Sequence, residues 1–545
     1  MSGDVTVTGG TNNGYGSPPS YNLGFNHADT AYNHAVALAS VLNSTYSGSA
    51  TQLAPDTGTP GGLVISPDQA STYADLSGFA AIAIQDTANP QTVVGGGIAN
   101  QTVISGVGNL TFFAQNADGE DHTNVTFAAL GGNNEISLFG NDGQDNIWAS
   151  SGNDTAIGGD VSTNIQLGTG RNSVEAHGGL TNIQVDGQDT LSLGSGHAQV
   201  YIDPAASGAS EVIHGIGHTT LTSGFSLTFI NGAAASTVLG GGGSYYVLAG
   251  AGGGTYTGGA GGNNQLLGGT GNVHLIGGGN LDFLSGGSGN DTIKAGNGAT
   301  VYINSGTGAT SILAGSGRDI MKAGGADTIH LGSGYSYIDA SGGSPTVSAL
   351  IQGATMVTNG SNPSLTFVGS ASASTILGGA GSYQIDGGKG GGVFTGGSAG
   401  GNYIHGTGAM TIFGTGSNNV MIGGDSGNNL VVAGTGLNGT EILGAGAGNA
   451  TLVGNSNKDD FSFANIGTLA GAYTVEGFHT GDLISFADEA SASYALSHYD
   501  VSSNTNGTIT LGNNTTIVLQ GYTGSLGTQT GYAGYHNGAR TDLVT

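Results

Sequence analysis

Aspartates recur in glycine-rich segments of this sequence, at spacings that suggest a shared chemical role. Residues 286–294 read GGSGNDTIK, with aspartate at the sixth place, and several other segments carry aspartate at or beside that place. Carboxylates are the oxygen ligands that Ca²⁺ prefers, whereas aspartate is also a good turn former without a metal. Both roles stay open for the eight candidate ligands, which are Asp145, Asp154, Asp282, Asp291, Asp319 and Asp327, with Asp142 and Asp160 at third places.

The segments around these aspartates follow a nine-residue pattern. Glycines fill the first half of each unit, where they suit tight turns. The last places favour β-branched and aromatic residues, which suit a short strand. A turn and a strand repeated in this way predict a β-solenoid. A longer unit of about 138 residues is duplicated, because FSLTFINGAAASTVLGG at 225–241 returns as PSLTFVGSASASTILGG at 363–379.

The pattern divides the chain into three predicted regions. Residues 1–95 are expected to form a small mixed domain with one helix at about 25–46, where alanine, valine and leucine have helical spacing. Residues 96–455 are expected to form a right-handed parallel β-roll or β-solenoid. Residues 456–545 alternate apolar and polar residues and are expected to form a β domain that covers the end of the solenoid. The predicted fold class is therefore mainly β.

The amino-acid composition excludes some classes of protein and favours some kinds of partner. Glycine provides 110 of the 545 residues, but nine prolines are too few for collagen. Acidic residues outnumber basic ones by 35 to 7, which gives a net charge of −28. We therefore expect divalent cations as partners and no nucleic acid. The sequence has no cysteine, and it contains no run of eighteen apolar residues, so we expect no membrane span.

The nonapeptides resemble those of the RTX (repeats-in-toxin) proteins. GGSGNDTIK fits the pattern G-G-x-G-x-D-x-U-x, and GNDGQDNIW and AGSGRDIMK depart from it at one place each. The resemblance implies a β-roll with two nonapeptides per coil and calcium between turns that lie about eighteen residues apart. The C-terminal segments DDFSF, FHTGDLISF and GTITLGNNTTIVLQG are similar to the ends of RTX proteins exported by type I secretion. That similarity implies an uncleaved C-terminal export signal and an extracellular or cell-surface location.

Eighteen-residue stacking would place few carboxylates next to one another. One predicted column runs Asn263, Asp282, Thr300, Asp319, and a second runs Val273, Asp291, Thr310, Asp327. In an earlier block, Asp145 is expected on Thr163 and Asp154 on Asn172. We therefore predict a partly degenerate ladder, in which some turns bind calcium at roughly millimolar concentration and others close through Asn and Thr hydrogen bonds.

No catalytic motif supports an enzyme. The zinc-protease motif H-E-x-x-H does not occur, and the G-x-S-x-G match at 396–400 lies in a glycine-rich repeat. We expect a secreted structural protein, not an enzyme, that self-assembles outside the cell as a surface layer, fibre or biofilm matrix stiffened by calcium. The alternatives are an adhesin for a cell-surface polysaccharide, a polysaccharide-modifying enzyme, or an ice-binding protein that uses rows such as Thr163, Asn172 and Thr181.

Overall fold

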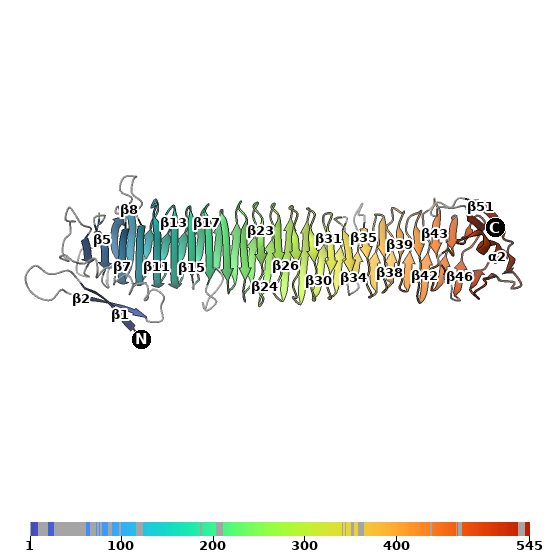
Figure 1. Ribbon diagram of the computed structural model, residues 1–545, viewed down its shortest axis with the longest axis horizontal. Helices are drawn as coiled ribbons and strands as arrows, with labels where there is room; N and C mark the ends of the chain where they lie inside the picture. Colours follow the sequence, from blue (N-terminus) through green and yellow to red (C-terminus); the bar gives the residue numbers. More distant parts are fainter. Residues whose placement is uncertain are drawn as a thin grey trace, which may run out of the picture. The chain divides into compact units, whose positions relative to one another are not determined.

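The computed structural model shows a β-solenoid of stacked parallel coils (Figure 1). It describes residues 2–8, 20–26, 61–65, 72–73, 76, 79–84, 90–96, 100–115, 124–185, 188–202, 211–340, 342–343, 345–349, 354–357, 365–436, 439–464, 466, 471–531 and 540–544. The predicted helix at 25–46 lies outside these residues, except that Phe25 and Asn26 end a strand. The chain divides into two compact units, 1–274 and 275–545, which do not coincide with the three predicted regions.

The first unit begins with the antiparallel strands β1 (Ser2–Thr8) and β2 (Ser20–Asn26). Later strands alternate between two parallel sheets. The odd-numbered sheet contains β3 (Gly61–Ile65), β5 (Phe79–Ile84), β7 (Asn100–Val107), β9 (Asn124–Gly131), β11 (Gln144–Ser151), β13 (Ser162–Thr169), β15 (Leu180–Val185), β17 (His197–Ile202), β19 (His218–Ser223), β21 (Ser236–Gly240) and β23 (Gly254–Thr257). The even-numbered sheet contains β4 (Thr72–Tyr73), β6 (Gln91–Gly96), β8 (Leu110–Gln115), β10 (Glu135–Ser137), β12 (Thr155–Ile157), β14 (Ser173–Glu175), β16 (Thr190–Leu193), β18 (Glu211–Gly215), β20 (Leu227–Asn231), β22 (Tyr245–Leu248) and β24 (Asn263–Leu267).

The boundary between the units falls in β25 (Val273–Ile276), and the second unit repeats the alternation. Its even-numbered sheet contains β26 (Leu281–Gly287), β28 (Thr300–Gly306), β30 (Arg318–Lys322), β32 (Ser336–Asp339), β34 (Ala354–Val357), β36 (Ser374–Leu377), β38 (Gly392–Thr395), β40 (Met410–Phe413), β42 (Asn428–Val432), β44 (Asn449–Val453) and β46 (Ala472–Glu476). Its odd-numbered sheet contains β27 (Thr292–Lys294), β29 (Ser311–Leu313), β31 (Thr328–Leu331), β33 (Thr346–Ala349), β35 (Leu365–Val368), β37 (Tyr383–Asp386), β39 (Tyr403–His405), β41 (Val420–Ile422), β43 (Glu441–Gly444), β45 (Asp459–Ser462) and β47 (Leu483–Ser485).

The second unit ends in strands that leave the parallel pattern. Strand β50 (Thr516–Gln520) lies parallel to β46 and antiparallel to β49 (Asn506–Thr510), which pairs with β48 (Tyr499–Asp500). Strand β52 (Arg540–Val544) runs antiparallel to β47 and to β51 (Gly527–Gly531). Helix α2 (Glu489–Ser497) was not predicted, and its N-cap Asp488 accepts a hydrogen bond from Ser491 N at 2.7 Å.

The parallel stacking extends beyond the predicted boundaries of the solenoid. It is present from β3, which pairs with β5 before residue 96. It continues past residue 456, because β45 pairs in parallel with β47 and β44 with β46. The segments at both ends therefore share the coil architecture of the middle of the chain.

Each coil holds two strands and two turns, and its interior is aliphatic. In the first unit, Ile147, Ile165, Ile183 and Val200 are in register on β11, β13, β15 and β17 and are at most 3% exposed. A matching interior row in the second unit begins with Ile293, Ile312 and Ile329. These are the apolar places of the nonapeptides, so the period that the sequence predicted is the period of the core.

Glycines are required where one coil passes over the next. Gly152 has a φ of 131°, and a Cβ there would lie 1.6 Å from the carbonyl oxygen of Gly132 on the preceding coil. No residue with a side chain fits such a position, which explains why glycine fills the first half of the units.

The same turn contacts occur in both units at positions 138 residues apart. In the first unit, Tyr245 Oη accepts a hydrogen bond from Gly241 N at 2.9 Å, and Asn264 Oδ1 accepts one from Tyr245 N at 3.1 Å. In the second unit, Tyr383 Oη and Asn402 Oδ1 accept the equivalent bonds at 2.8 and 2.9 Å. The repeated sequence therefore encodes a repeated local structure.

Candidate functional site

The candidate site is a ladder of polar side chains buried inside the turns. On one edge of the first unit, Asn134, Asp154, Asn172 and Asp189 follow one another, and each is at most 3% exposed. Asp154 Oδ1 accepts from Asn134 N at 2.9 Å, Asn172 Oδ1 from Asp154 N at 3.0 Å, and Asp189 Oδ1 from Asn172 N at 2.9 Å. Each side chain thus binds the main chain of the preceding coil, and Asp154 lies on Asn172 as predicted.

Asp145 begins an equivalent column on the other edge. Its Oδ1 atom accepts hydrogen bonds from Val125 N at 2.9 Å and from Asn141 Nδ2 at 2.6 Å. Thr163 is in register with Asp145, as predicted, and its Oγ1 accepts from Gly159 N at 3.0 Å. A threonine thus closes its own turn at a place where other nonapeptides of this chain have aspartate.

In the second unit, aspartates serve the same turns. Asp327 Oδ1 accepts from Thr310 N at 3.0 Å, and its Oδ2 accepts from Ser305 Oγ at 2.7 Å. Asp319 Oδ2 accepts from Gly315 N at 3.0 Å. Asp282 Oδ1 accepts a hydrogen bond from Gly279 N at 3.3 Å. Asp282 and Asp291 are both buried. The residues Asp291, Thr310 and Asp327 follow one another in the predicted order. Ser311 N, next to Thr310, donates to Asp291 O, and Thr310 N donates to Asp327 Oδ1.

The other predicted column is wrong by one residue at two positions. Asp282 is in register with Val301, and Val301 with Asp319, so Thr300 does not belong to the buried column. Asn264 is buried at 1% exposure, whereas Asn263 is exposed. A shift of one residue moves a side chain to the opposite face of a strand, and irregular unit lengths concealed the shift in the sequence.

The two third-place aspartates have different positions. Asp142 is partly buried and lies close enough to raise the pKa of Asp145. Asp160 is exposed, although its main-chain N–H bonds to Asn141 O at 2.7 Å. The structure therefore places Asp142, but not the side chain of Asp160, beside the buried ladder.

Three of the predicted ligands are buried carboxyl groups with strongly raised pKa values. Burial is the largest cause, and it outweighs the hydrogen bonds that favour the charged form, so the pKa rises to about 6 for Asp145, Asp154 and Asp319. Within the described part of the chain, one carboxylate oxygen of each has no hydrogen-bond partner, namely Asp145 Oδ2, Asp154 Oδ2 and Asp319 Oδ1. These oxygens are where a proton or a cation would reduce the cost of burying the charge.

The turn at Asp145 places the Oδ2 atom of this residue near the main-chain carbonyl of Asn141. A Cβ on Gly159 would lie 2.5 Å from Asp145 Oδ2 and 2.8 Å from Asn141 O. The same pairing of a carboxylate with a carbonyl oxygen occurs at Gly277, where a Cβ would lie 2.7 Å from Asp282 Oδ2 and 2.4 Å from Ala295 O. It occurs again at Gly286, where a Cβ would lie 2.7 Å from Asp291 Oδ2 and 2.3 Å from Ser305 O. One carboxylate with carbonyl oxygens suits a hard cation. Among the described residues, however, no three His, Asp or Glu side chains converge on one point.

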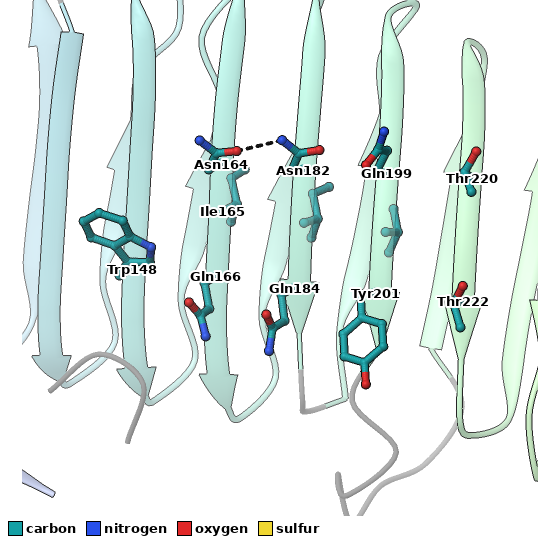
Figure 2. A pocket seen from close by; sticks show the side chains of 12 residues that line it. Trp148, Asn164, Ile165, Gln166, Asn182, Gln184, Gln199, Tyr201, Thr220 and Thr222 are labelled. Carbon is teal, nitrogen blue, oxygen red and sulfur yellow. Dashed lines mark hydrogen bonds between the residues drawn. The ribbon is translucent and has the colours of Figure 1, made fainter. Parts of the chain in front are cut away.

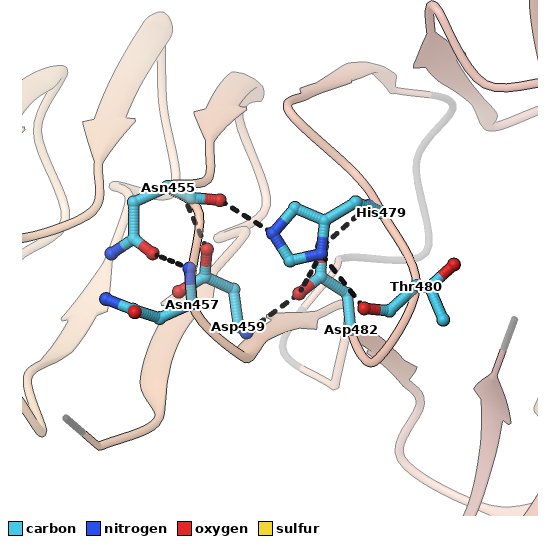
Figure 3. Close-up of polar contacts among 6 residues, drawn as sticks. All are labelled: Asn455, Asn457, Asp459, His479, Thr480 and Asp482. Atoms are coloured by element: carbon cyan, nitrogen blue, oxygen red, sulfur yellow. Dashed lines mark hydrogen bonds and ion pairs between the residues drawn. The ribbon is translucent and has the colours of Figure 1, made fainter. Parts of the chain in front are cut away.

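Asp459, His479 and Asp482 lie close together near the C-terminus (Figure 3). They belong to the C-terminal segments quoted above, but the sequence did not predict that they form one group with Glu441. Glu441 and Asp459 are in register on β43 and β45, and Asp482 Oδ1 accepts from Asp459 N at 3.0 Å. His479 Nδ1 lies 3.6 Å from Asp482 Oδ1, and His479 Nε2 contacts Asn455 O at 2.9 Å. The eighteen-residue spacing of Glu441 and Asp459 was the available signal, but it crosses the predicted domain boundary.

Asp459 has the most perturbed carboxyl group of this set. Burial, followed by the charges of Asp482 and Glu441, raises its pKa to about 7, whereas the hydrogen bond from Asn455 N at 2.7 Å and the charge of His479 lower it. Its Oδ1 atom has no hydrogen-bond partner among the described residues. The pKa of His479 is also raised, because the carboxylate of Asp482 and main-chain carbonyls outweigh its desolvation.

Asn419 provides a test of the ladder's structural role. Its Nδ2 donates to Glu441 Oε2 at 2.7 Å, and its Oδ1 accepts from Asn402 N at 3.1 Å. We expect Asn419→Ala to lower the free energy of unfolding by about 1–3 kcal/mol, because it leaves buried polar groups without partners. Exposed Asn428 is the matched control, and Asn428→Ala should cost less than about 0.5 kcal/mol in the same denaturant titration. Equal effects of the two substitutions would contradict this role.

The outer faces of the sheets carry further candidate features. In the second unit, Phe283, Tyr302, Ile320 and Tyr337 are in register on β26, β28, β30 and β32, and we call them the aromatic row. Phe283 is 42% exposed and Tyr302 39%, and their rings stack with centroids 4.9 Å apart. The residues considered for ice binding, Thr163, Asn172 and Thr181, are at most 3% exposed, so they do not form an outer row.

The sequence matches no protein family model and no curated protein, and no solved structure matches the chain. In the described part of the chain, no helix has the length and apolar character that a membrane span requires.

Proposed function

We propose that this chain is a secreted structural protein that self-assembles outside the cell into a surface layer, fibre or biofilm matrix. The observation that carries the proposal is the aromatic row. Phe283 and Tyr302 are exposed, and Ile320 and Tyr337 are partly exposed. Apolar side chains that repeat in this way at the strand spacing make a flat, ridged surface, and contiguous apolar patches mark interaction sites. A second copy of the same face is a suitable partner, since flat sheets pack face to face through interdigitating side chains.

Calcium is proposed as the stiffening ion, and the RTX family as the origin of the repeats. The buried carboxylates next to turn carbonyls support this assignment, with Asp145, Asp282 and Asp291 as the best-placed ligands. Bound calcium would supply positive charge that offsets the cost of burying a carboxylate in the turn. With one carboxylate per turn, the sites suit extracellular calcium concentrations. Export by type I secretion rests on the resemblance of residues 459–521 alone.

Assembly of the full chain tests the proposal. Sedimentation and electron microscopy, with about 5 mM calcium and with chelator, should reveal filaments or sheets that need calcium. We expect the double variant Phe283→Ser/Tyr302→Ser to raise the concentration needed for assembly at least about tenfold, because it removes two apolar anchors. Phe139→Ser is the matched control, since Phe139 is 64% exposed and lies outside the row.

Each result has a separate meaning. Assembly of the double variant at the wild-type concentration would exclude the aromatic row as the contact. Assembly that is indifferent to chelator would remove calcium from the proposal and leave the aspartates as turn formers. Unassembled wild-type protein in both conditions would favour the second candidate function, an adhesin, for which a groove in the first unit provides the observation.

A further inference from the structure

The outer face of the odd-numbered sheet in the first unit is hollowed by a groove of about 460 Å³ (Figure 2). It crosses five neighbouring strands, from β11 to β19. Two rows of side chains form its walls: one contains Asn164, Asn182, Gln199 and Thr220, and the other contains Trp148, Gln166, Gln184, Tyr201 and Thr222. The groove therefore runs across the strands, along the direction in which the coils stack.

Two aromatic rings stand in the same row with two glutamines between them. Trp148, Gln166, Gln184 and Tyr201 occupy equivalent positions on β11, β13, β15 and β17. Trp148 is partly exposed and Tyr201 is 44% exposed. Three strand spacings separate the rings, which is about 14 Å. An extended polymer lying in the groove would thus meet an aromatic ring at two points along its length.

The polar groups between the rings differ in how they are bonded. Asn182 Nδ2 donates to Asn164 Oδ1 at 2.7 Å, and Asn164 Nδ2 to Asn146 Oδ1 at 2.9 Å, so the asparagines form a rigid ladder. The side-chain amides of Gln166 and Gln184 make no hydrogen bond within the described part of the chain (Figure 2). Each glutamine therefore offers a donor and an acceptor to a ligand.

The described lining of the groove carries no charge, although the chain as a whole is strongly acidic. Among the described residues that line it there is no Asp, Glu, Lys, Arg or His, whereas the net charge of the protein is −28. Uncharged amides and hydroxyls suit a ligand that has many hydroxyl groups and no charge. Aromatic rings suit a ligand with apolar faces. A neutral sugar has both kinds of surface, since its C–H groups cover the ring faces and its hydroxyls lie around the edge.

We propose that this groove binds a neutral polysaccharide that lies across the strands, with Trp148 and Tyr201 stacked on sugar faces and with Gln166 and Gln184 bonded to hydroxyls. The inference deepens the second candidate function by naming its site and ligand class. It does not depend on self-assembly, because the aromatic row lies in the other unit and does not line the groove.

Trp148 makes the test direct, because it is the sole tryptophan in the chain. The full-length protein is titrated with hydroxyethyl cellulose, galactomannan and dextran, with alginate as the anionic comparison, and tryptophan emission and gel retardation are followed. We expect at least one neutral polymer to shift the emission with saturation and to retard the protein, and alginate to do neither. No response to any neutral polymer, or tighter binding of alginate, overturns the proposal.

Variants then locate the binding. We expect Trp148→Ala and Tyr201→Ala each to weaken retardation about tenfold, since each removes one stacked ring. Tyr201→Phe keeps the ring and should bind within about twofold of wild type. Phe283→Ala removes an exposed aromatic side chain elsewhere and should have no effect, and circular dichroism checks that each variant folds. Wild-type binding by both alanine variants would place the sugar elsewhere and refute this site.

Discussion

Without calcium, the protein should become more stable as the pH falls from 8 to about 5, which is opposite to the usual acid destabilisation of proteins whose carboxylates are paired. The carboxyl groups of Asp145, Asp154 and Asp319 have pKa values near 6, and that of Asp459 is near 7, all raised chiefly by burial. A thermal melt followed by circular dichroism in chelator, at several pH values, measures the effect.

The sign follows from proton binding. Between the ordinary pKa near 3.8 and the folded value near 6, the folded protein holds more protons than the unfolded chain. The stabilisation is therefore complete below about pH 3.8 and is lost as the pH rises through 6, or through 7 for Asp459. Each group contributes about 1–3 kcal/mol, after a discount for the screening of turns that lie near solvent. His479 acts in the same direction, because its pKa is also raised.

Calcium provides the control for this prediction. If calcium binds the buried carboxylates, a few millimolar should restore the melting midpoint at pH 8 and flatten its dependence on pH, because the ion replaces the protons. A chelated protein whose midpoint falls steadily between pH 8 and pH 5 would show that the ladder carboxylates are stabilised in their charged form, contrary to the burial that the structure gives them.

Much of the fold could be predicted from the sequence because the nine-residue period is local. Glycine is needed where coils cross, as at Gly152, and the apolar place becomes an interior row such as Ile147, Ile165 and Ile183. Two nine-residue units make one coil, so residues eighteen apart lie on neighbouring coils. The neighbours Asp145 and Thr163, and Asp154 and Asn172, were therefore predicted correctly. The same logic identified six aspartates that the structure buries at the turns.

The errors arose where the period slips. A step of nineteen residues put Val301, not Thr300, beside Asp282. In the other direction the prediction assumed nineteen residues between Asn263 and Asp282, whereas the buried residue is Asn264, eighteen residues before Asp282. The Glu441–Asp459 pair was missed because a change of composition near residue 456 looked like the end of the solenoid, although the coils continue. The groove between Trp148 and Tyr201 needed the register of four strands before its two rings could be placed in one row.

Asp459→Asn should stabilise the protein at pH 8 in chelator by about 2 kcal/mol, a discounted share of a pKa shift from 3.8 to about 7. The amide keeps an oxygen for Asn455 N, and it removes a buried negative charge that lies near Asp482 and Glu441. Amide hydrogen exchange in β45 and β47 measures the change locally. It should show slower exchange at pH 8 and a smaller difference between pH 6 and pH 8 than in wild type.

Asp488→Asn is the matched control for this variant. Asp488 is an exposed N-cap whose pKa is lowered by its hydrogen bonds to Ser491, and asparagine caps a helix about as well as aspartate. Its replacement should leave the pH dependence between 6 and 8 unchanged. The two variants should also differ with calcium: Asp459→Asn would lose stabilisation by the ion at this coil if Asp459 is a ligand, and Asp488→Asn would keep it. If Asp459→Asn destabilised the chelated protein at pH 8, the carboxylate would have to be stabilised in its charged form, and burial would not control the chemistry of the ladder.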